Sequence, residues 1–224
     1  ELQESWDNSG LLIGNKHAQV TQIVLCLDIT YELIASLPMG ALIISHHPLI
    51  FSKLSVLHMH TPLGRMIELM IQKGVSHIAM HTNVDKTHLN NYVATQVLGW
   101  ERYEMNDFVC TTSLEISFET LLASVKKGFS LEKCVVVPTT RPIKRVALTT
   151  GSGGSLIERL DADVFITGDL KYHEALIAQE KGMGVIDVTH HASESFFGAS
   201  LIDELKTLPI NVTIHFTNNP MKII

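Results

Sequence analysis

The apolar residues of this chain form short runs that alternate with segments of helical spacing. Seven runs of four to six residues, mostly rich in β-branched side chains, predict buried strands: Ile23–Leu27, Ala41–Ser45, Val75–Met80, Cys134–Val137, Arg145–Thr149, Val164–Thr167 and Val185–Val188. Five segments space their apolar residues by three and four and predict helices: Pro62–Lys73, Leu89–Leu98, Phe118–Lys127, Leu170–Lys181 and Glu194–Leu205. Alternating strands and helices indicate an α/β fold.

No linker rich in Pro, Gly or Ser divides the chain, and no internal repeat or low-complexity stretch is present. The stretch from Tyr103 to Thr140 has the least regular pattern and is the candidate boundary between two parts. We therefore expect a single compact domain over residues 1–224, with two α/β halves of about 1–105 and 106–224 as the alternative.

Polar groups follow five of the predicted strands. Ligands of open α/β sheets bind outside the carboxyl ends of the strands, so these positions are candidates for function. The residues concerned are Asp28, the run His46-His47-Pro48, the segment from His81 to Asp85, Asp169, and the segment from Thr189 to Glu194. A sheet is expected to gather at least some of these imidazoles and carboxylates along one edge.

Two of these clusters have the residue types of a metal site. His46 and His47 precede Pro48, which favours an extended backbone at His47; they are either metal ligands or residues that pack at a helix start. His190 and Glu194 have the i, i+4 spacing that places two side chains on one face of a helical turn. The lack of nearby Cys disfavours a closed structural zinc site, whereas mixed His and carboxylate ligands suit Zn, Mn, Fe or Co.

Asp85 is a further candidate ligand, although an Asp at this position is also a good helix cap, and taken alone that is the better interpretation. Together the five residues His46, His47, Asp85, His190 and Glu194 exceed the ligand number of one tetrahedral ion. Five ligands favour two ions that share a bridging carboxylate, with open positions for water.

Two other features have an open interpretation. Gly151–Ser155 lies between a predicted strand and a predicted helix, where main-chain N–H groups can bind an anion, but it matches neither the Walker nor the Rossmann pattern. It is either a phosphate-binding loop or a flexible turn. His173, on a predicted helix, either faces the site as a proton donor or lies in solvent.

The composition excludes several classes of protein. The 224 residues are 46% hydrophobic and 18% charged, which excludes a disordered chain. A chain of this length buries roughly 70% of its unfolded surface, so no metal is needed merely to fold it. The net charge of −6, with no run rich in Lys or Arg, argues against a nucleic-acid-binding groove.

The cysteines and the lack of a long apolar run bear on localisation. Cys26, Cys110 and Cys134 are odd in number and form no C-x-x-C motif, which favours free thiols in a reducing compartment. No run approaches the ~20 apolar residues of a membrane span, and no secretory leader opens the sequence. We expect a cytoplasmic protein. The chain opens at Glu1 rather than Met, so an N-terminal piece outside this numbering stays an open question.

Several motifs occur together in one order. They are Glu4-x-Trp6-Asp7-Asn8-x-Gly10-Leu11, Ser45-His46-His47-Pro48-Leu49, His81-Thr82-x-x-Asp85, Thr167-Gly168-Asp169 and His190-x-Ala192-x-Glu194. In this order the chain resembles the GTP cyclohydrolase I type 2-like proteins, also called NIF-three-like dinuclear metal proteins. The resemblance spans nearly the whole sequence, although Asp169 stands where that family usually has Glu.

The resemblance implies an α/β fold of two similar halves packed around a dinuclear metal cleft, and a homohexamer. By motif position, the family's metal ligands correspond to His46, His47, Asp85, His190 and Glu194, with Glu194 as the bridge. His81 and His173 fall on positions that line the family's cavity and are candidate proton-transfer residues. The interval from Tyr103 to Thr140 is too short for the domain that longer members carry there.

The leading functional hypothesis is a metal-dependent hydrolase of a nucleotide, with GTP ring opening as its reaction. Water activated by the ions would attack C8 of guanine, His81 or His173 would transfer protons, and Gly151–Ser155 with Lys53 or Lys171 would bind the triphosphate. The alternative is a non-catalytic metal-binding protein that acts in assembly, metal delivery or regulation. A third reading is a metal-free α/β domain with unrelated histidines.

Overall fold

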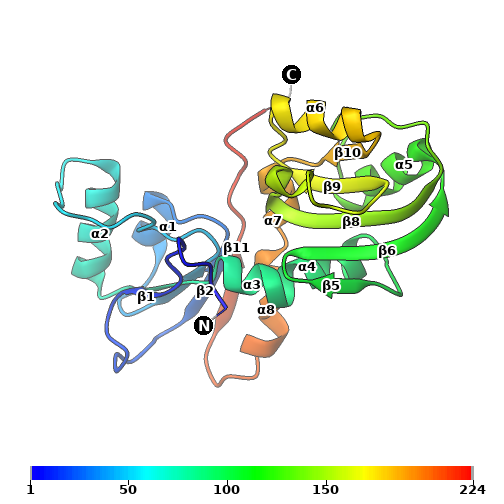
Figure 1. Cartoon of the computed structure of the whole chain (residues 1–224). Coiled ribbons are helices and arrows are strands. Elements are labelled where there is room, and N and C mark those ends of the chain that lie inside the picture. The colour runs from blue at the N-terminus through cyan, green and yellow to red at the C-terminus, as the bar shows by residue number, and fades with distance from the viewer. Residues whose placement is uncertain (1, 223–224) are drawn as a thin grey trace. The chain divides into compact units, whose positions relative to one another are not determined.

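A computed structural model describes residues 2–222 of the chain (Figure 1). It divides into two compact units. Unit 1 comprises the chain up to Val84 together with Phe197–Asn218, and unit 2 comprises Asp85–Phe196 and the segment from Asn219. The chain thus leaves unit 1 at residue 84 and returns to it at residue 197, rather than passing once from one half to the other near residue 105.

Unit 1 contains a five-stranded sheet whose order is β1-β4-β3-β2-β11. Four of its strands are parallel neighbours, and β1 runs antiparallel to β4. The strands are β1 (Gly10–Ile13), β2 (Ile23–Cys26), β3 (Leu42–Ser45), β4 (Ser76–Ala79) and β11 (Val212–His215). Because Cys26, Ser45 and Ala79 are in register, the residues that follow these three strands emerge at the same edge of the sheet.

Helices cover both faces of the sheet in unit 1. Ile43 of β3 packs in the cluster that includes α1 (Tyr31–Ser36) and α2 (Pro62–Lys73), whereas its neighbour Ile44 packs in the cluster that includes α8 (Phe197–Leu205). Thr61 caps the start of α2 by accepting a hydrogen bond from the N–H of Gly64. The short helix α3 (Thr82–Val84) directly follows the edge at which β4 ends.

Unit 2 contains a six-stranded sheet whose order is β5-β6-β8-β9-β10-β7. Its centre, β8-β9-β10, is parallel, and β5, β6 and β7 are joined antiparallel at the two sides. The strands are β5 (Glu104–Asn106), β6 (Val109–Ile116), β7 (Val135–Val137), β8 (Ile143–Ser152), β9 (Val164–Gly168) and β10 (Gly184–Asp187).

Helices also cover both faces of the sheet in unit 2. Phe165 of β9 packs against the face covered by α6 (Tyr172–Lys181), whereas Ile166 packs with α5 (Phe118–Gly128). A helical segment on the α5 face is π-helical in two places: η1 (Asp85–Leu89), α4 (Asn90–Tyr92) and η2 (Val93–Val97). The remaining short helices are η3 (Gly154–Leu156) and α7 (His190–Glu194).

The structure confirms the predicted α/β fold with two sheets, and each predicted strand is present with ends shifted by at most three residues. The stretch from Tyr103 to Thr140, which has the least regular pattern, holds β5, β6, α5 and β7; α5 and β7 were predicted, whereas β5 and β6 were not. It lies wholly within unit 2, so it is not the boundary between the two units. The predicted helix Glu194–Leu205 is interrupted, because α7 ends at Glu194 and α8 begins at Phe197.

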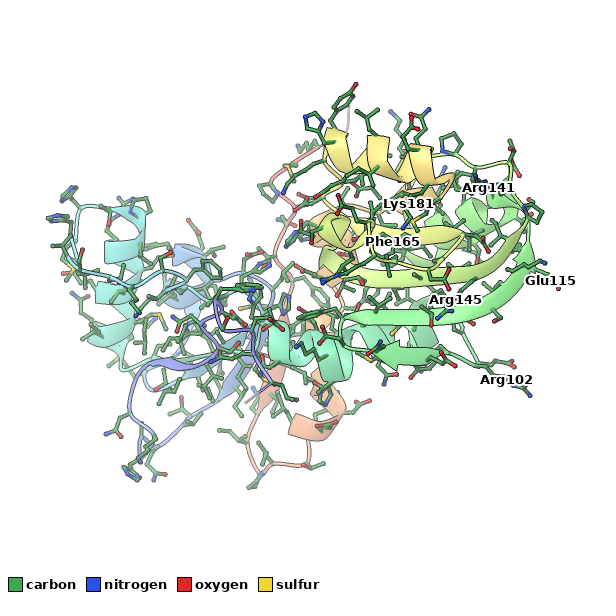
Figure 2. The ribbon with its side chains drawn as sticks, viewed as in Figure 1. Arg102, Glu115, Arg141, Arg145, Phe165 and Lys181 are labelled. Carbon is green, nitrogen blue, oxygen red and sulfur yellow. The ribbon has the colours of Figure 1, made fainter. Side chains whose placement is uncertain are left out.

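A lysine closes one helix of each unit, α2 in unit 1 and α6 in unit 2, in the same way. Lys73 ends α2, and its Nζ donates to the carbonyls of residues 34 and 35. Lys181 ends α6, and its Nζ donates to the carbonyls of residues 157, 158 and 160. Figure 2 marks Lys181 and Phe165 on the α6 side of the sheet, with Arg141, which donates to the carbonyl of Lys181. Each lysine precedes a glycine in the left-handed region.

No helix within residues 2–222 is both long enough and apolar enough to cross a membrane.

Candidate metal-binding residues

Three imidazoles gather at the strand-end edge of unit 1. His46 and His47 directly follow β3, and His81 follows β4 after one residue. Each of the three offers a ring nitrogen that lies within 4.8 Å of one from both others. His46 is fully buried, and His47 and His81 are partly buried. The structure therefore brings the predicted ligands His46 and His47 together and adds His81, which was predicted as a proton-transfer residue.

The Nδ1 atom of each ring contacts an oxygen that can only accept a hydrogen bond. His46 Nδ1 lies 3.0 Å from the carbonyl oxygen of Met80, His47 Nδ1 lies 2.7 Å from Asp28 Oδ1, and His81 Nδ1 lies 2.8 Å from Asp7 Oδ1. A neutral imidazole in this position carries its proton on Nδ1 and its lone pair on Nε2. Oxygen partners of this kind orient the histidines that bind metals in proteins.

Asp7 connects the N-terminal segment to the edge of the sheet. Its carboxylate is completely buried and accepts hydrogen bonds from the side chains of His81, Thr82 and Ser9, and from two main-chain N–H groups. Burial alone would raise the pKa of Asp7, but the hydrogen bonds from Thr82 and His81 outweigh it and lower the pKa to about 2. Burial lowers the pKa of His81, and the bond to Asp7 opposes that shift.

A buried pair of side chains lies behind the two adjacent histidines. Ser45 Oγ donates to the main-chain oxygen of His47 (2.6 Å) and lies 2.7 Å from His77 Nε2. Because the serine hydroxyl has a single proton, His77 Nε2 is the donor in the second contact. Ser45 and His77 are both fully buried, and burial lowers the pKa of His77 to about 4. The pair fixes the backbone at His47.

In unit 2, α7 places His190 and Glu194 on one face, as the i, i+4 spacing predicted. His190 Nε2 lies 2.9 Å from Glu194 Oε2, and His190 Nδ1 lies 2.7 Å from Asp169 Oδ2. One imidazole thus lies between two carboxylates. Its Nδ1 is placed to donate to Asp169, and its Nε2 faces Glu194, where a metal ion or a proton shared by the two groups can be held. Glu194 is 3% exposed, so its charge lies in a region of low polarity where such a cation is strongly favoured.

The backbone of unit 2 is distorted around this pair. Asp169 (φ 54°) and Thr189 (φ 72°) are non-glycine residues in the left-handed region, which is costly for a β-branched side chain. Asp187 stabilises both bends, because its carboxylate accepts from the N–H groups of Leu170 (2.9 Å) and Thr189 (2.7 Å). Gly151 (φ 66°) has no room for a Cβ, which would collide with Glu194 Oε1.

Other predicted residues have different surroundings. Asp85 begins η1 and is 9% exposed; within unit 2 it forms no three-ligand group with His190 and Glu194 among the described residues. His173 is exposed on α6, its ring lies 5.4 Å from that of Tyr172, and no hydrogen bond joins it to His190 or Glu194 in the described part of unit 2.

Two N–H groups of Gly151–Ser155, the segment interpreted as either a phosphate-binding loop or a turn, donate to side chains of the protein. The N–H of Gly151 donates to Ser193 Oγ (2.8 Å), and that of Gly153 donates to Thr167 Oγ1 (3.0 Å). Gly151 and Ser152 also belong to β8, and the helix that follows, η3, has only three residues. These bonds favour a structural turn over an anion site.

The donor set fits a divalent transition metal. Unit 1 supplies neutral imidazoles, and unit 2 supplies an imidazole with a buried carboxylate, which are the ligand types that Zn, Fe, Mn and Co accept. Each of these four histidines has its Nδ1 on an oxygen acceptor. Neither unit adds a cysteine to its set.

Sequence reasoning did not assign the carboxylates Asp7, Asp28 and Asp169 to the rings that they orient. Asp28 and Asp169 did carry a signal, since each follows a predicted strand. Asp7 lies in the motif around Trp6, but nothing in the sequence pairs it with His81, 74 positions away.

Comparison with known proteins identifies relatives along the whole chain. A family model described as Duf34/NIF3 (NGG1p interacting factor 3) matches residues 1–221. The chain is 41% identical over 222 residues to a protein of Campylobacter jejuni named GTP cyclohydrolase 1 type 2 homolog, covering 99% of this chain and 92% of that protein. It is also 41% identical over 226 residues to the GTP cyclohydrolase 1 type 2 of Helicobacter pylori, covering 100% of this chain and 93% of that one.

Solved structures share the fold. The crystal structure of Staphylococcus aureus protein SA1388 superimposes with a TM-score of 0.85 at 26% identity, covering 100% of this chain and 94% of that one. The resemblance drawn from the sequence motifs is confirmed, and the chain belongs to the Duf34/NIF3 family.

Proposed function

We propose that this protein binds two divalent metal ions and uses them to hydrolyse a nucleotide. The observation that carries the metal proposal is the orientation of three imidazoles, those of His46, His47 and His190, each held at Nδ1 by a carboxylate or carbonyl oxygen. This arrangement directs the Nε2 lone pairs of neutral rings toward a cation, and it is the usual support for metal-binding histidines.

The family resemblance supplies the proposed ligands. They are His46, His47, Asp85, His190 and Glu194, with Glu194 as the bridging carboxylate. Support comes from the paired rings of unit 1, from the carboxylates on both sides of His190, and from the match of these residues to the family motifs. Zn, Fe, Mn and Co all suit such a set, which lacks sulfur.

When bound, the ions would supply Lewis acidity and make water a nucleophile at neutral pH. The chain's own residues would orient the reactants and move protons. His81 is suited to proton transfer because Asp7 fixes its ring and its proton, while burial keeps its Nε2 neutral. His173, exposed on α6, is the second candidate for this role.

GTP is the first substrate to test, with water addition at C8 of guanine as the reaction. The names of the Campylobacter and Helicobacter relatives support this choice. The family resemblance also supports a homohexamer in the cytoplasm, and we include both in the proposal.

The metal proposal is tested by elemental analysis. Purified protein is loaded separately with Zn, Mn, Fe or Co and freed of excess ion, and the bound metal is counted. We expect two ions per chain, fewer in Glu194→Gln, and no change in Glu180→Gln, which alters an exposed glutamate on α6 of the same unit. Less than one ion per chain in every case would contradict the proposal.

The substrate proposal is tested with the loaded protein and a panel of nucleotides, phosphoesters and amides. We expect consumption of GTP that is lost in Glu194→Gln and kept in Glu180→Gln. Full metal content with no turnover in any combination would favour the non-catalytic alternative. Unchanged turnover in Glu194→Gln would contradict the assignment of the site.

A further inference from the structure

Two aromatic side chains of unit 1 are exposed beside its imidazole cluster. Trp6, in the N-terminal segment, is 59% exposed, and Phe51, in the loop after β3, is 49% exposed. Their ring centroids lie 6.2 Å apart, with the ring planes inclined by 56°. Large rings in water are unfavourable, so covering them would contribute binding energy.

His81 connects this aromatic pair to the other imidazoles. Its centroid lies 6.2 Å from that of Trp6 and 6.2 Å from that of Phe51, with interplanar angles of 82° and 89°. The His81 ring also lies next to the other imidazoles, since its centroid is 5.1 Å from that of His46. The exposed rings therefore directly flank the residue that is best suited to proton transfer.

Hydrogen bonds of neighbouring residues hold the backbone on which both rings are carried. Asp7, next to Trp6, bonds to His81 and Thr82, and the main-chain N–H of Glu4 donates to Thr82 Oγ1 (3.0 Å). Asn8 Nδ2 donates to the carbonyl oxygen of Ile50, which anchors the backbone next to Phe51. The backbone of both residues is thus positioned before any ligand arrives, which lowers the entropic cost of binding.

We propose that Trp6 and Phe51 bind the planar base of the substrate, which stacks on their exposed faces beside His81. Stacking of a nucleobase on an aromatic side chain is favourable and does not depend on a particular pattern of hydrogen bonds. A sugar phosphate without a base would gain nothing from these rings. This inference rests on the proposed nucleotide substrate and extends it, because it assigns recognition of the base to two residues.

Tryptophan fluorescence tests the proposal directly. The chain has two tryptophans, and Trp100 is 7% exposed, so Trp100→Phe leaves Trp6 as the reporter. This variant, loaded with Zn, is titrated with guanosine, GTP and inorganic triphosphate. We expect saturable quenching by guanosine and GTP and none by triphosphate. Quenching by triphosphate alone, or no quenching by either base-containing ligand, would overturn the proposal.

Affinity measurements on variants separate stacking from a structural effect. In equilibrium dialysis with guanosine, Trp6→Leu and Phe51→Leu should each weaken binding about tenfold or more, whereas Trp6→Phe should recover most of the affinity. Tyr31→Leu is the matched control, since Tyr31 is another exposed aromatic residue of unit 1. Equal loss in all four variants would contradict a specific role for the two rings.

The stacking proposal and the proposed hydrolysis can fail separately. If Trp6→Leu keeps its metal and turns over GTP with an unchanged KM, the stacking proposal fails while the proposed function stands. If guanosine quenches Trp6 although no nucleotide is hydrolysed, the stacking proposal stands and the hydrolase fails. If Trp6 emission responds to protein concentration and not to guanosine, a second copy of the chain covers the rings and the proposal is wrong.

Discussion

In both units three neighbouring strands are parallel and end at the same edge of their sheet, β2-β3-β4 in unit 1 and β8-β9-β10 in unit 2. The residues that follow them differ in chemistry. Unit 1 supplies three imidazoles, each with one oxygen partner, and unit 2 supplies one imidazole between two carboxylates. The same strand arrangement thus presents neutral nitrogen ligands in one unit and mainly anionic oxygen ligands in the other.

The two units also fix these groups by different means. In unit 1 one of the two orienting carboxylates, Asp7, comes from the N-terminal segment outside the sheet, and positive φ angles are confined to glycines among its described residues. In unit 2 the supporting carboxylate is that of Asp187, the last residue of β10, and the residues Asp169 and Thr189, which follow strands, have positive φ angles. The orientation of the His81 imidazole in unit 1 therefore depends on the N-terminal segment. The placement of His190 and Glu194 in unit 2 depends on a distorted backbone.

The strongest test of this difference is Gly151→Ala in unit 2. A Cβ here would collide with Glu194 Oε1 in a backbone with φ 66°, so Glu194 must rotate away from its position. We expect about a hundredfold weaker binding of Zn, measured by competition with a chelator. Gly99→Ala is the control, because its φ is 68° and a Cβ would have nothing within 4 Å. Equal affinities of the two variants would show that the contact has no effect.

Acid should destabilise the protein through His77 of unit 1. The folded-state pKa of about 4 lies below the ordinary value of 6.5, so the unfolded chain takes up the proton first. The stabilisation is complete above pH 6.5 and is lost as the pH falls toward 4, by about 3 kcal/mol in all.

Urea unfolding of metal-free protein at several pH values between 7.5 and 4 measures this loss. His77→Gln, which keeps an amide donor for Ser45 but does not titrate, should lose less stability over the same range. Identical pH profiles for the two proteins would contradict the assignment.

The lysines that close α2 and α6 should differ in their contribution to stability. Lys181 donates to three carbonyls and Lys73 donates to two. We expect Lys181→Met to lower the free energy of unfolding by about 2 kcal/mol and Lys73→Met by about 1 kcal/mol. Chemical unfolding followed by circular dichroism gives both values, and a larger loss for Lys73→Met would reverse the comparison.

Replacing one orienting carboxylate by its amide should weaken metal binding less than Gly151→Ala does. Asn keeps an oxygen that accepts from Nδ1 but loses the charge, so Asp28→Asn in unit 1 and Asp169→Asn in unit 2 should each weaken Zn binding about tenfold. Asp161→Asn, at a side chain that is 98% exposed, is the control. A loss in only one of the variants would show that only one unit depends on this support.

The sequence predicted most of the fold because the parallel strands are continuous apolar runs. It did not predict β6, whose polar residues Thr111, Thr112 and Ser113 interrupt the apolar pattern although the strand is partly buried. The break between α7 and α8 was also not predicted, since the apolar spacing continues through Phe196 and Phe197.

The pairing of His190 with Glu194 was predictable because it depends on local helical spacing. The grouping of His46, His47 and His81 in unit 1 could be predicted only in general terms, because residues that follow parallel strands tend to lie at one edge of the sheet. The contact of Asp7 with His81 and the exposure of Trp6 depend on how the N-terminal segment folds back on the sheet, which no local pattern encodes.

Most of unit 2 lies in the sequence between the two segments of unit 1, and this order has a consequence for synthesis on the ribosome. All six strands of the second sheet have been translated by residue 187, whereas the first sheet lacks β11 until residue 215 has emerged. During that interval β2 has an open side, which chaperones or neighbouring chains can reach. The part of the protein that is made first is therefore the last to be completed.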